Sequence, residues 1–149
     1  MKIINILICF MFSQTVAAEQ AHDHHHHEKT ELKLSFNNGK KWPTDLALRS
    51  NMDTIHDHIK SKIKKIHAGD MTDGEFKKLG EQIKTNTDDI FKNCKLEPEA
   101  DAQLHLVMAG ILTASEKLVG KASLQEKRKA VDEILSHYKS YLKYFDHKN

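Results

Sequence analysis

The sequence has little cysteine, proline or glycine, and no large excess of charge of either sign. Two cysteines, two prolines and six glycines in 149 residues exclude a disulfide-rich scaffold and a proline- or glycine-rich low-complexity chain. The formal net charge of +2, with histidine counted as neutral, gives no field that would attract nucleic acid, so we expect no nucleic-acid partner. What remains is one globular domain with an unusual excess of histidine, 11 residues in all.

The first 18 residues have the pattern of a secretory signal peptide. A positive start precedes an apolar run over residues 3–12, and Val16 and Ala18 occupy the −3 and −1 positions of a cleavage site. The run is too short for a stable membrane anchor, and Cys9 lies too early in it for lipid attachment. We therefore predict a signal peptide at residues 1–18, export to the periplasm, and no stable membrane insertion.

A histidine-rich tract follows the predicted cleavage site. Residues 19–31 contain almost no apolar side chain larger than alanine, so burial cannot offset the entropy cost of ordering, and we predict a disordered arm. Neutral imidazoles bind copper, zinc and nickel, and neighbouring carboxylates can add oxygen ligands. The predicted metal ligands in this arm are His22, His24, His25, His26 and His27. A solvated linker with incidental metal affinity is the alternative interpretation.

The rest of the chain is predicted to be an extended linker and four helices. Residues 32–44 alternate apolar and polar side chains around an Asn-Asn-Gly turn. Beyond them, apolar residues recur at three- and four-residue intervals in four stretches, roughly 45–67, 72–94, 98–120 and 123–145. Short connections make neighbouring helices antiparallel, so residues 45–149 are predicted to form an all-α, up-down-up-down four-helix bundle.

The predicted topology gathers a second set of candidate ligands at one end of the bundle. Once Cys9 is removed with the signal peptide, Cys94 is the single cysteine, which excludes an internal disulfide. Thiolate, thioether and imidazole together suit a soft ion such as Cu(I), and the candidates are Cys94, Met52 and His105. Core packing of Cys94 and Met52 is the competing interpretation, as is a bridge between two molecules through Cys94.

Motifs of catalysis are missing from the sequence. We find no G-x-S-x-G, P-loop or H-E-x-x-H motif, and a tight bundle would offer no cleft, so the chain is not expected to be an enzyme. Haem held between Met52 and His137 is a further alternative, although there is no C-x-x-C-H attachment motif and His137 points away from the core stripe.

Several segments of the chain resemble an uncharacterised family of small exported proteobacterial proteins. The matching segments are 34–42 (LSFNNGKKW), 93–96 (NCKL), Ala100-Asp101 and Leu104-His105. Members of that family often carry a histidine-rich stretch before the N-N-G-K-K-W segment. The resemblance implies export, an intact domain and an association with heavy-metal handling.

Together these patterns predict a periplasmic protein that buffers, sequesters or transfers a transition metal, copper or else zinc or nickel. A metal-transport protein is a partner that such a role would involve. The alternative function is that of an exported helical adaptor or stress protein with an incidental histidine arm, and a haem-binding electron carrier comes third.

Overall fold

The computed structural model describes residues 33–148, which all belong to one compact unit. The predicted signal peptide (1–18) and the histidine arm (19–31) lie outside the described residues, as do the five histidines of the arm. The described part is all-α, as predicted, with two isolated β-bridges and no strand in residues 33–148. Its five helices are α1 (Leu46–Lys60), α2 (Ile63–Ala68), α3 (Asp73–Asn93), α4 (Pro98–Val119) and α5 (Leu124–Tyr144).

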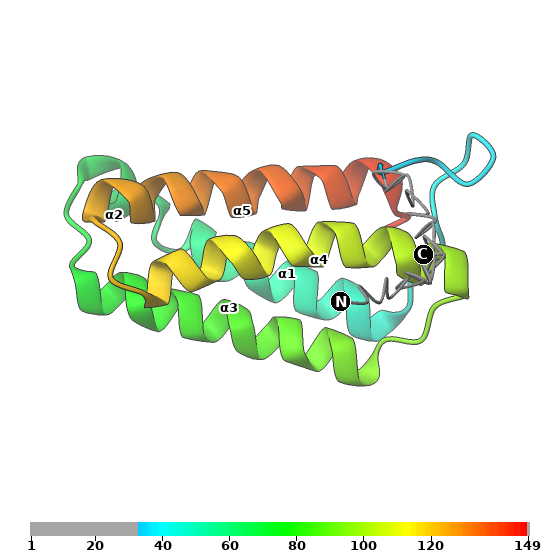
Figure 1. The fold of residues 1–149 in the computed structure, drawn as a ribbon, viewed down its shortest axis with the longest axis horizontal. Coiled ribbons are helices and arrows are strands. Elements are labelled where there is room, and N and C mark those ends of the chain that lie inside the picture. The colour runs from blue at the N-terminus through cyan, green and yellow to red at the C-terminus, as the bar shows by residue number, and fades with distance from the viewer. Residues whose placement is uncertain (1–32, 149) are drawn as a thin grey trace, which may run out of the picture. The chain divides into compact units, whose positions relative to one another are not determined.

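Four long helices, α1, α3, α4 and α5, lie side by side (Figure 1). Helix α1 packs against α3, α3 against α4, and α4 against α5, with a smaller contact between α1 and α5. Fully buried apolar side chains from all four helices meet along their length, among them Met52, Phe76, Val107 and Tyr141. None of the helices in residues 33–148 combines the length and apolar character needed to cross a membrane.

The predicted first helix is not continuous, and this part of the sequence interpretation was wrong. Helix α1 ends at Lys60, and the chain turns at Ser61 and Lys62 before α2 begins. The Lys62 N–H donates to the Ile59 carbonyl, three residues back, which tightens the turn and ends the regular four-residue pattern. The apolar spacing hides the break because residues on both sides of it still face the core.

The helix starts follow the local signals in the sequence. Thr72 and Ser123 each form a complete capping box with the glutamate three residues later, at α3 and α5. Pro98 occupies the first position of α4, where its missing N–H is not needed. The side chain of Asp45 caps α1 by accepting a hydrogen bond from the Leu48 N–H at 2.8 Å.

The linker before α1 is tied to the end of the chain. The turn at Asn38 and Gly39, both with positive φ, returns the chain to Trp42, whose backbone pairs with the segment after α5. The Trp42 N–H donates to the Tyr144 carbonyl and the Asp146 N–H donates to the Trp42 carbonyl, each at 2.8 Å. This pairing fixes the C-terminal residues beside the start of α1.

Candidate functional site

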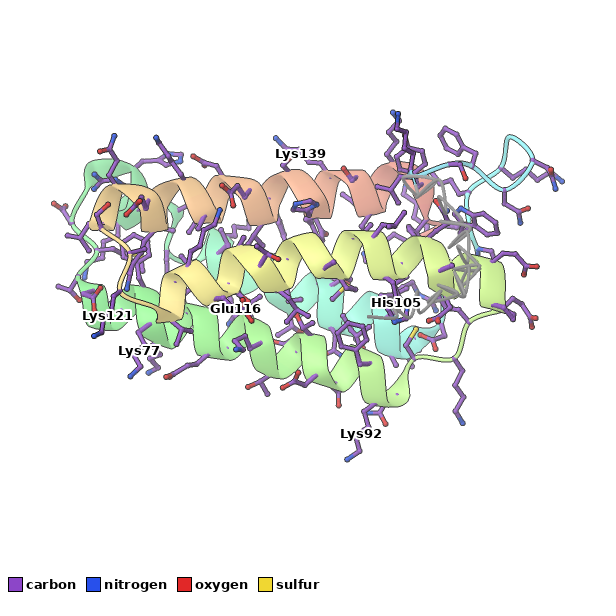
Figure 2. The ribbon with its side chains drawn as sticks, viewed as in Figure 1. Lys77, Lys92, His105, Glu116, Lys121 and Lys139 are labelled. Carbon is purple, nitrogen blue, oxygen red and sulfur yellow. The ribbon has the colours of Figure 1, made fainter. Side chains whose placement is uncertain are left out.

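The structure brings two of the predicted ligands, Cys94 and His105, to a common pocket of about 320 Å³. Cys94 is the residue that follows the last turn of α3, and His105 lies in the second turn of α4, beside α3 (Figure 2). The remaining lining residues are Ile90, Phe91, Lys95, Leu96, Asp101 and Leu104. Cys94 is half-buried, although its position in the apolar stripe had suggested a place in the core.

Burial, together with two nearby carboxylates, keeps the Cys94 thiol protonated. Burial, followed by the charge and hydrogen bond of the Asp45 carboxylate and the charge of Asp101, raises the pKa of Cys94 to about 12. Asp45 is held at this place because it caps α1 and also accepts a hydrogen bond from the Lys95 N–H, at 2.6 Å. At neutral pH the pocket therefore presents a thiol, and a bound cation would have to displace its proton.

One nitrogen of His105 is already engaged. Its Nδ1 lies 2.9 Å from the Asp101 carbonyl oxygen and 3.4 Å from the Asp101 carboxylate, and its ring contacts Phe91 with centroids 5.5 Å apart. A carbonyl or carboxylate at one ring nitrogen orients an imidazole so that the other nitrogen can ligate a metal. The His105 side chain is 57% exposed, and its Nε2 has no protein partner within residues 33–148.

Met52, the third predicted ligand, lies elsewhere. It is fully buried in the core on α1 and does not line the Cys94–His105 pocket. Within residues 33–148, no group of three or more histidine, cysteine, aspartate or glutamate side chains is placed to hold a metal ion. The pocket thus offers the thiol of Cys94 and the imidazole of His105, with the carboxylate of Asp101 also in its lining.

Met52 and His137, the two residues considered as haem ligands, each pack against other parts of the domain. Met52 is enclosed in the core, and the His137 ring of α5 lies directly against Gly110 of α4. A Cβ added at Gly110 would be 2.1 Å from the His137 ring, so only glycine allows this contact.

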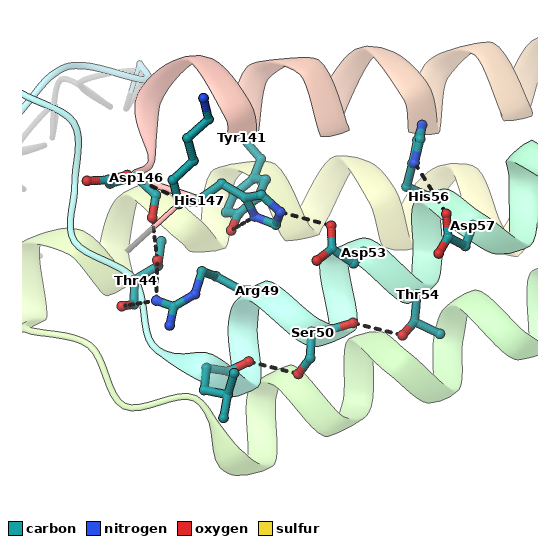
Figure 3. Close-up of polar contacts among 12 residues, drawn as sticks. Thr44, Arg49, Ser50, Asp53, Thr54, His56, Asp57, Tyr141, Asp146 and His147 are labelled. Carbon is teal, nitrogen blue, oxygen red and sulfur yellow. Dashed lines mark hydrogen bonds and ion pairs between the residues drawn. The ribbon is translucent and has the colours of Figure 1, made fainter.

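A polar chain that the sequence analysis missed joins α1, α5 and the C-terminal segment (Figure 3). The buried Tyr141 hydroxyl lies 2.8 Å from His147 Nδ1, and His147 Nε2 lies 2.8 Å from the Asp53 carboxylate. The hydroxyl donates to Nδ1 when the neutral ring carries its proton on Nε2 and donates it to Asp53. These two hydrogen bonds hold the C-terminal segment against α1 and α5, so the primary role of the three residues is structural.

Stability should fall in alkaline solution because of Tyr141. Burial, with smaller contributions from Tyr138 and Asp53, raises the pKa of Tyr141 above its ordinary value of 10.0. As pH rises past 10, the unfolded chain loses this proton before the folded protein does, so the free energy of unfolding decreases. We expect Tyr141→Phe to cost about 1 kcal/mol at pH 7 and to flatten the decline above pH 10.

Urea unfolding between pH 7 and 11 would measure this effect, with Tyr144→Phe as the control. Tyr144 is on the same helix but outside the Tyr141–His147–Asp53 chain. An unchanged alkaline decline in Tyr141→Phe would contradict the assignment.

Comparison with known proteins adds no identification. No family model matches the chain, and no curated protein or solved structure matches it significantly. The resemblance drawn from the N-N-G-K-K-W segment therefore stays a prediction, and a function must be argued from the residues themselves.

Proposed function

We propose that this is a periplasmic transition-metal-binding protein, not an enzyme, that buffers, sequesters or transfers copper, or else zinc or nickel. The observation that carries the proposal is the tract of five histidines between His22 and His27, with carboxylates at Asp23 and Glu28. Imidazoles so closely spaced can wrap one ion without a preformed cage.

The helical domain serves as the scaffold of this protein, and we propose that it is an up-down-up-down four-helix bundle. The connections between its long helices from α3 onward are the four-residue segments 94–97 and 120–123. Connections this short leave a chain no length to return along a helix, so successive helices run antiparallel. The same topology places the end of α3 and the start of α4 together, where Cys94 and His105 lie.

The segment before α1 contacts the same helix, α4, that carries His105. The Ser35 N–H donates to Gln103 Oε1 at 2.7 Å, and Gln103 lies on α4 between Asp101 and His105 in sequence.

A soft ion fits this second position best. Cu(I) binds thiolate and imidazole well, whereas a protonated thiol at neutral pH is a poor ligand for harder ions. Binding at Cys94 would release the proton that the carboxylate of Asp45 helps to retain. The arm is the capture site in this proposal, and the pocket with Cys94 and His105 is a second position for Cu(I).

Metal titration of the untagged chain from residue 19 onward tests the proposal. Cu(II), Zn(II), Ni(II) and ascorbate-reduced Cu(I) are each titrated into three proteins. The first is wild type, the second carries alanine at His22, His24, His25, His26 and His27, and the third is Cys94→Ser. We expect the alanine variant to lose affinity for the divalent ions by at least about tenfold, and Cys94→Ser to weaken Cu(I) alone.

Two results would contradict this function. Wild type that binds no more tightly than a free peptide of residues 19–31 would leave the arm as an incidental linker and favour the adaptor alternative. Haem uptake with a visible absorbance band that persists in the alanine variant would favour the electron carrier instead.

A further inference from the structure

A second pocket lies at the other end of α5, far along the helix from the C-terminal segment. It has a volume of about 320 Å³, near the lower limit of roughly 300 Å³ for ligand sites in proteins. The last turn of α2 and the first three turns of α5 form it, and its lining residues are Ile66, His67, Gln125, Arg128, Lys129 and Asp132.

Nitrogen donors dominate this pocket. Arg128 brings a guanidinium, Lys129 an ammonium, His67 an imidazole and Gln125 an amide, whereas Asp132 is the single carboxylate in the lining. Two permanent positive charges against one negative charge give the pocket a net positive character at neutral pH. The stretch of chain that contributes His67 adds to it, because Lys60, Lys62, Lys64 and Lys65 precede His67 and no acidic residue occurs between Asp57 and Asp70.

Arg128 is the residue that most needs an explanation. It is half-buried, and its Nη1 lies against the backbone at Gly69, where an added Cβ would meet it at 3.4 Å. Within residues 33–148 its guanidinium makes no ion pair or side-chain hydrogen bond, although the neighbouring cation Lys127 is paired with Asp73. A guanidinium beside a pocket, with its donors not taken up by protein acceptors, can donate two parallel hydrogen bonds to an acceptor that comes from solution.

We propose that this pocket binds a phosphate group, with the Arg128 guanidinium as its principal ligand and Lys129, His67 and Gln125 around it. The excess of positive charge and the four donor side chains suit a tetrahedral phosphate, which has three or four acceptor oxygens and, near neutral pH, more negative charge than a carboxylate. The chemistry is the same for a small phosphorylated compound and for a phospholipid headgroup. The site is separate from the metal-binding proposal, and it is tested without added metal.

Titration with inorganic phosphate at constant ionic strength, balanced with chloride, is the first arm of the test. We expect saturable shifts of the backbone amide signals of His67, Gln125 and Lys129, and a loss of affinity of at least about tenfold in Arg128→Gln. Arg128→Lys keeps the charge but loses the bidentate donor geometry. Its affinity for phosphate should therefore lie between that of the wild type and that of Arg128→Gln. Lys139→Gln is the matched control, because Lys139 is an exposed cation on α5 that points away from the other helices (Figure 2).

Vesicles separate the two sources of the phosphate group. Co-sedimentation with phosphatidylglycerol vesicles but not with phosphatidylcholine vesicles, lost in Arg128→Gln and kept in Lys139→Gln, would assign the site to a headgroup. Phosphate binding without vesicle binding would assign it to a small phosphorylated compound.

The contrary results are equally specific. If Arg128→Gln merely lowers the melting temperature while phosphate and vesicles affect wild type and variant alike, Arg128 serves only to stabilise the end of α2 and the proposal is wrong. Lys129→Gln gives a second variant should Arg128→Gln fold poorly, and equal phosphate binding by Lys129→Gln and Lys139→Gln would also overturn the proposal.

Discussion

Iodoacetamide should alkylate Cys94 roughly 30 to 1,000 times more slowly in the native protein than in the unfolded chain at pH 8. The pKa of Cys94 rises from 9.0 to about 12, with burial as the main cause, and only the thiolate reacts. At a pH below both pKa values, each unit by which the pKa is raised lowers the thiolate fraction tenfold. The rise from 9.0 to about 12 therefore sets the upper limit of the expected slowing, about 1,000-fold. The lower figure allows for the greater nucleophilicity of a more basic thiolate.

Asp45→Asn separates the charge from the burial of Cys94. Asparagine caps a helix as well as aspartate does, so α1 should keep its start while the nearby negative charge is lost. We expect alkylation to accelerate by up to about tenfold, and not to the rate of the unfolded chain, because burial is the larger cause. Asp101→Asn is the matched control, since Asp101 contributes least and should change the rate less.

Mass spectrometry of quenched time points gives these rates directly, because the chain from residue 19 has a single cysteine. Native alkylation as fast as that of the urea-unfolded protein would show that Cys94 is neither shielded nor held protonated. The expected slow rate has a consequence for an exported protein. Disulfide exchange also requires the thiolate, so the same environment protects Cys94 from bridging two molecules.

The helices were largely predictable from the sequence because their starts are encoded locally. The capping boxes at Thr72 and Ser123, and Pro98 at the start of α4, each act within one turn and agree with the apolar spacing that follows. The break after Lys60 was not predictable in this way. Ile59 and Ile66 are both buried, so the apolar pattern continues across the break even though the backbone does not.

The candidate site was predictable only in part, because spacing gives the direction of a side chain but not its depth. The short connection at residues 94–97 brings Cys94 and His105 to one pocket, since each lies within about two turns of it. Met52 has a suitable direction as well, yet it lies too deep in the core to line the pocket. The contact of His147 with Asp53 has no local signal, because it depends on the backbone pairing of the C-terminal segment with Trp42.

Lys127 carried a signal that was overlooked. It lies four residues before the buried Val131, so it occupies the apolar stripe of α5, and its side chain is fully buried. A lysine at such a position is tolerated when an acidic partner reaches it. Asp73, in the first turn of α3, supplies that partner, with the Lys127 Nζ 2.5 Å from its carboxylate.

Loss of the Asp73 carboxylate should therefore be among the most destabilising single changes in the domain. Asp73→Ala leaves the buried ammonium of Lys127 without its ion-pair partner, and breaking a buried pair from one side costs about 3 kcal/mol or more. We take the lower end of that range because the Asp73 side chain is 69% exposed, which lets water approach the ammonium. Urea unfolding of the wild type and the variant at pH 7 measures the difference.

Removing both partners should be less harmful than removing Asp73 alone. Lys127→Met fills a similar volume without a charge, and replacing the whole pair by apolar groups is often close to neutral. The double variant Asp73→Ala/Lys127→Met should therefore unfold at a higher urea concentration than Asp73→Ala, which is a non-additivity that only a coupled pair produces.

Glu99→Ala provides the control for the loss of a negative charge at a helix start. Glu99 is in the first turn of α4, as Asp73 is in that of α3, so its removal costs only the helix-dipole contribution of up to about 1 kcal/mol. If Asp73→Ala costs no more than Glu99→Ala, and its effect adds to that of Lys127→Met, the ammonium does not depend on Asp73. If the coupling is present, a single exposed carboxylate is what allows α5 to place a lysine in the core.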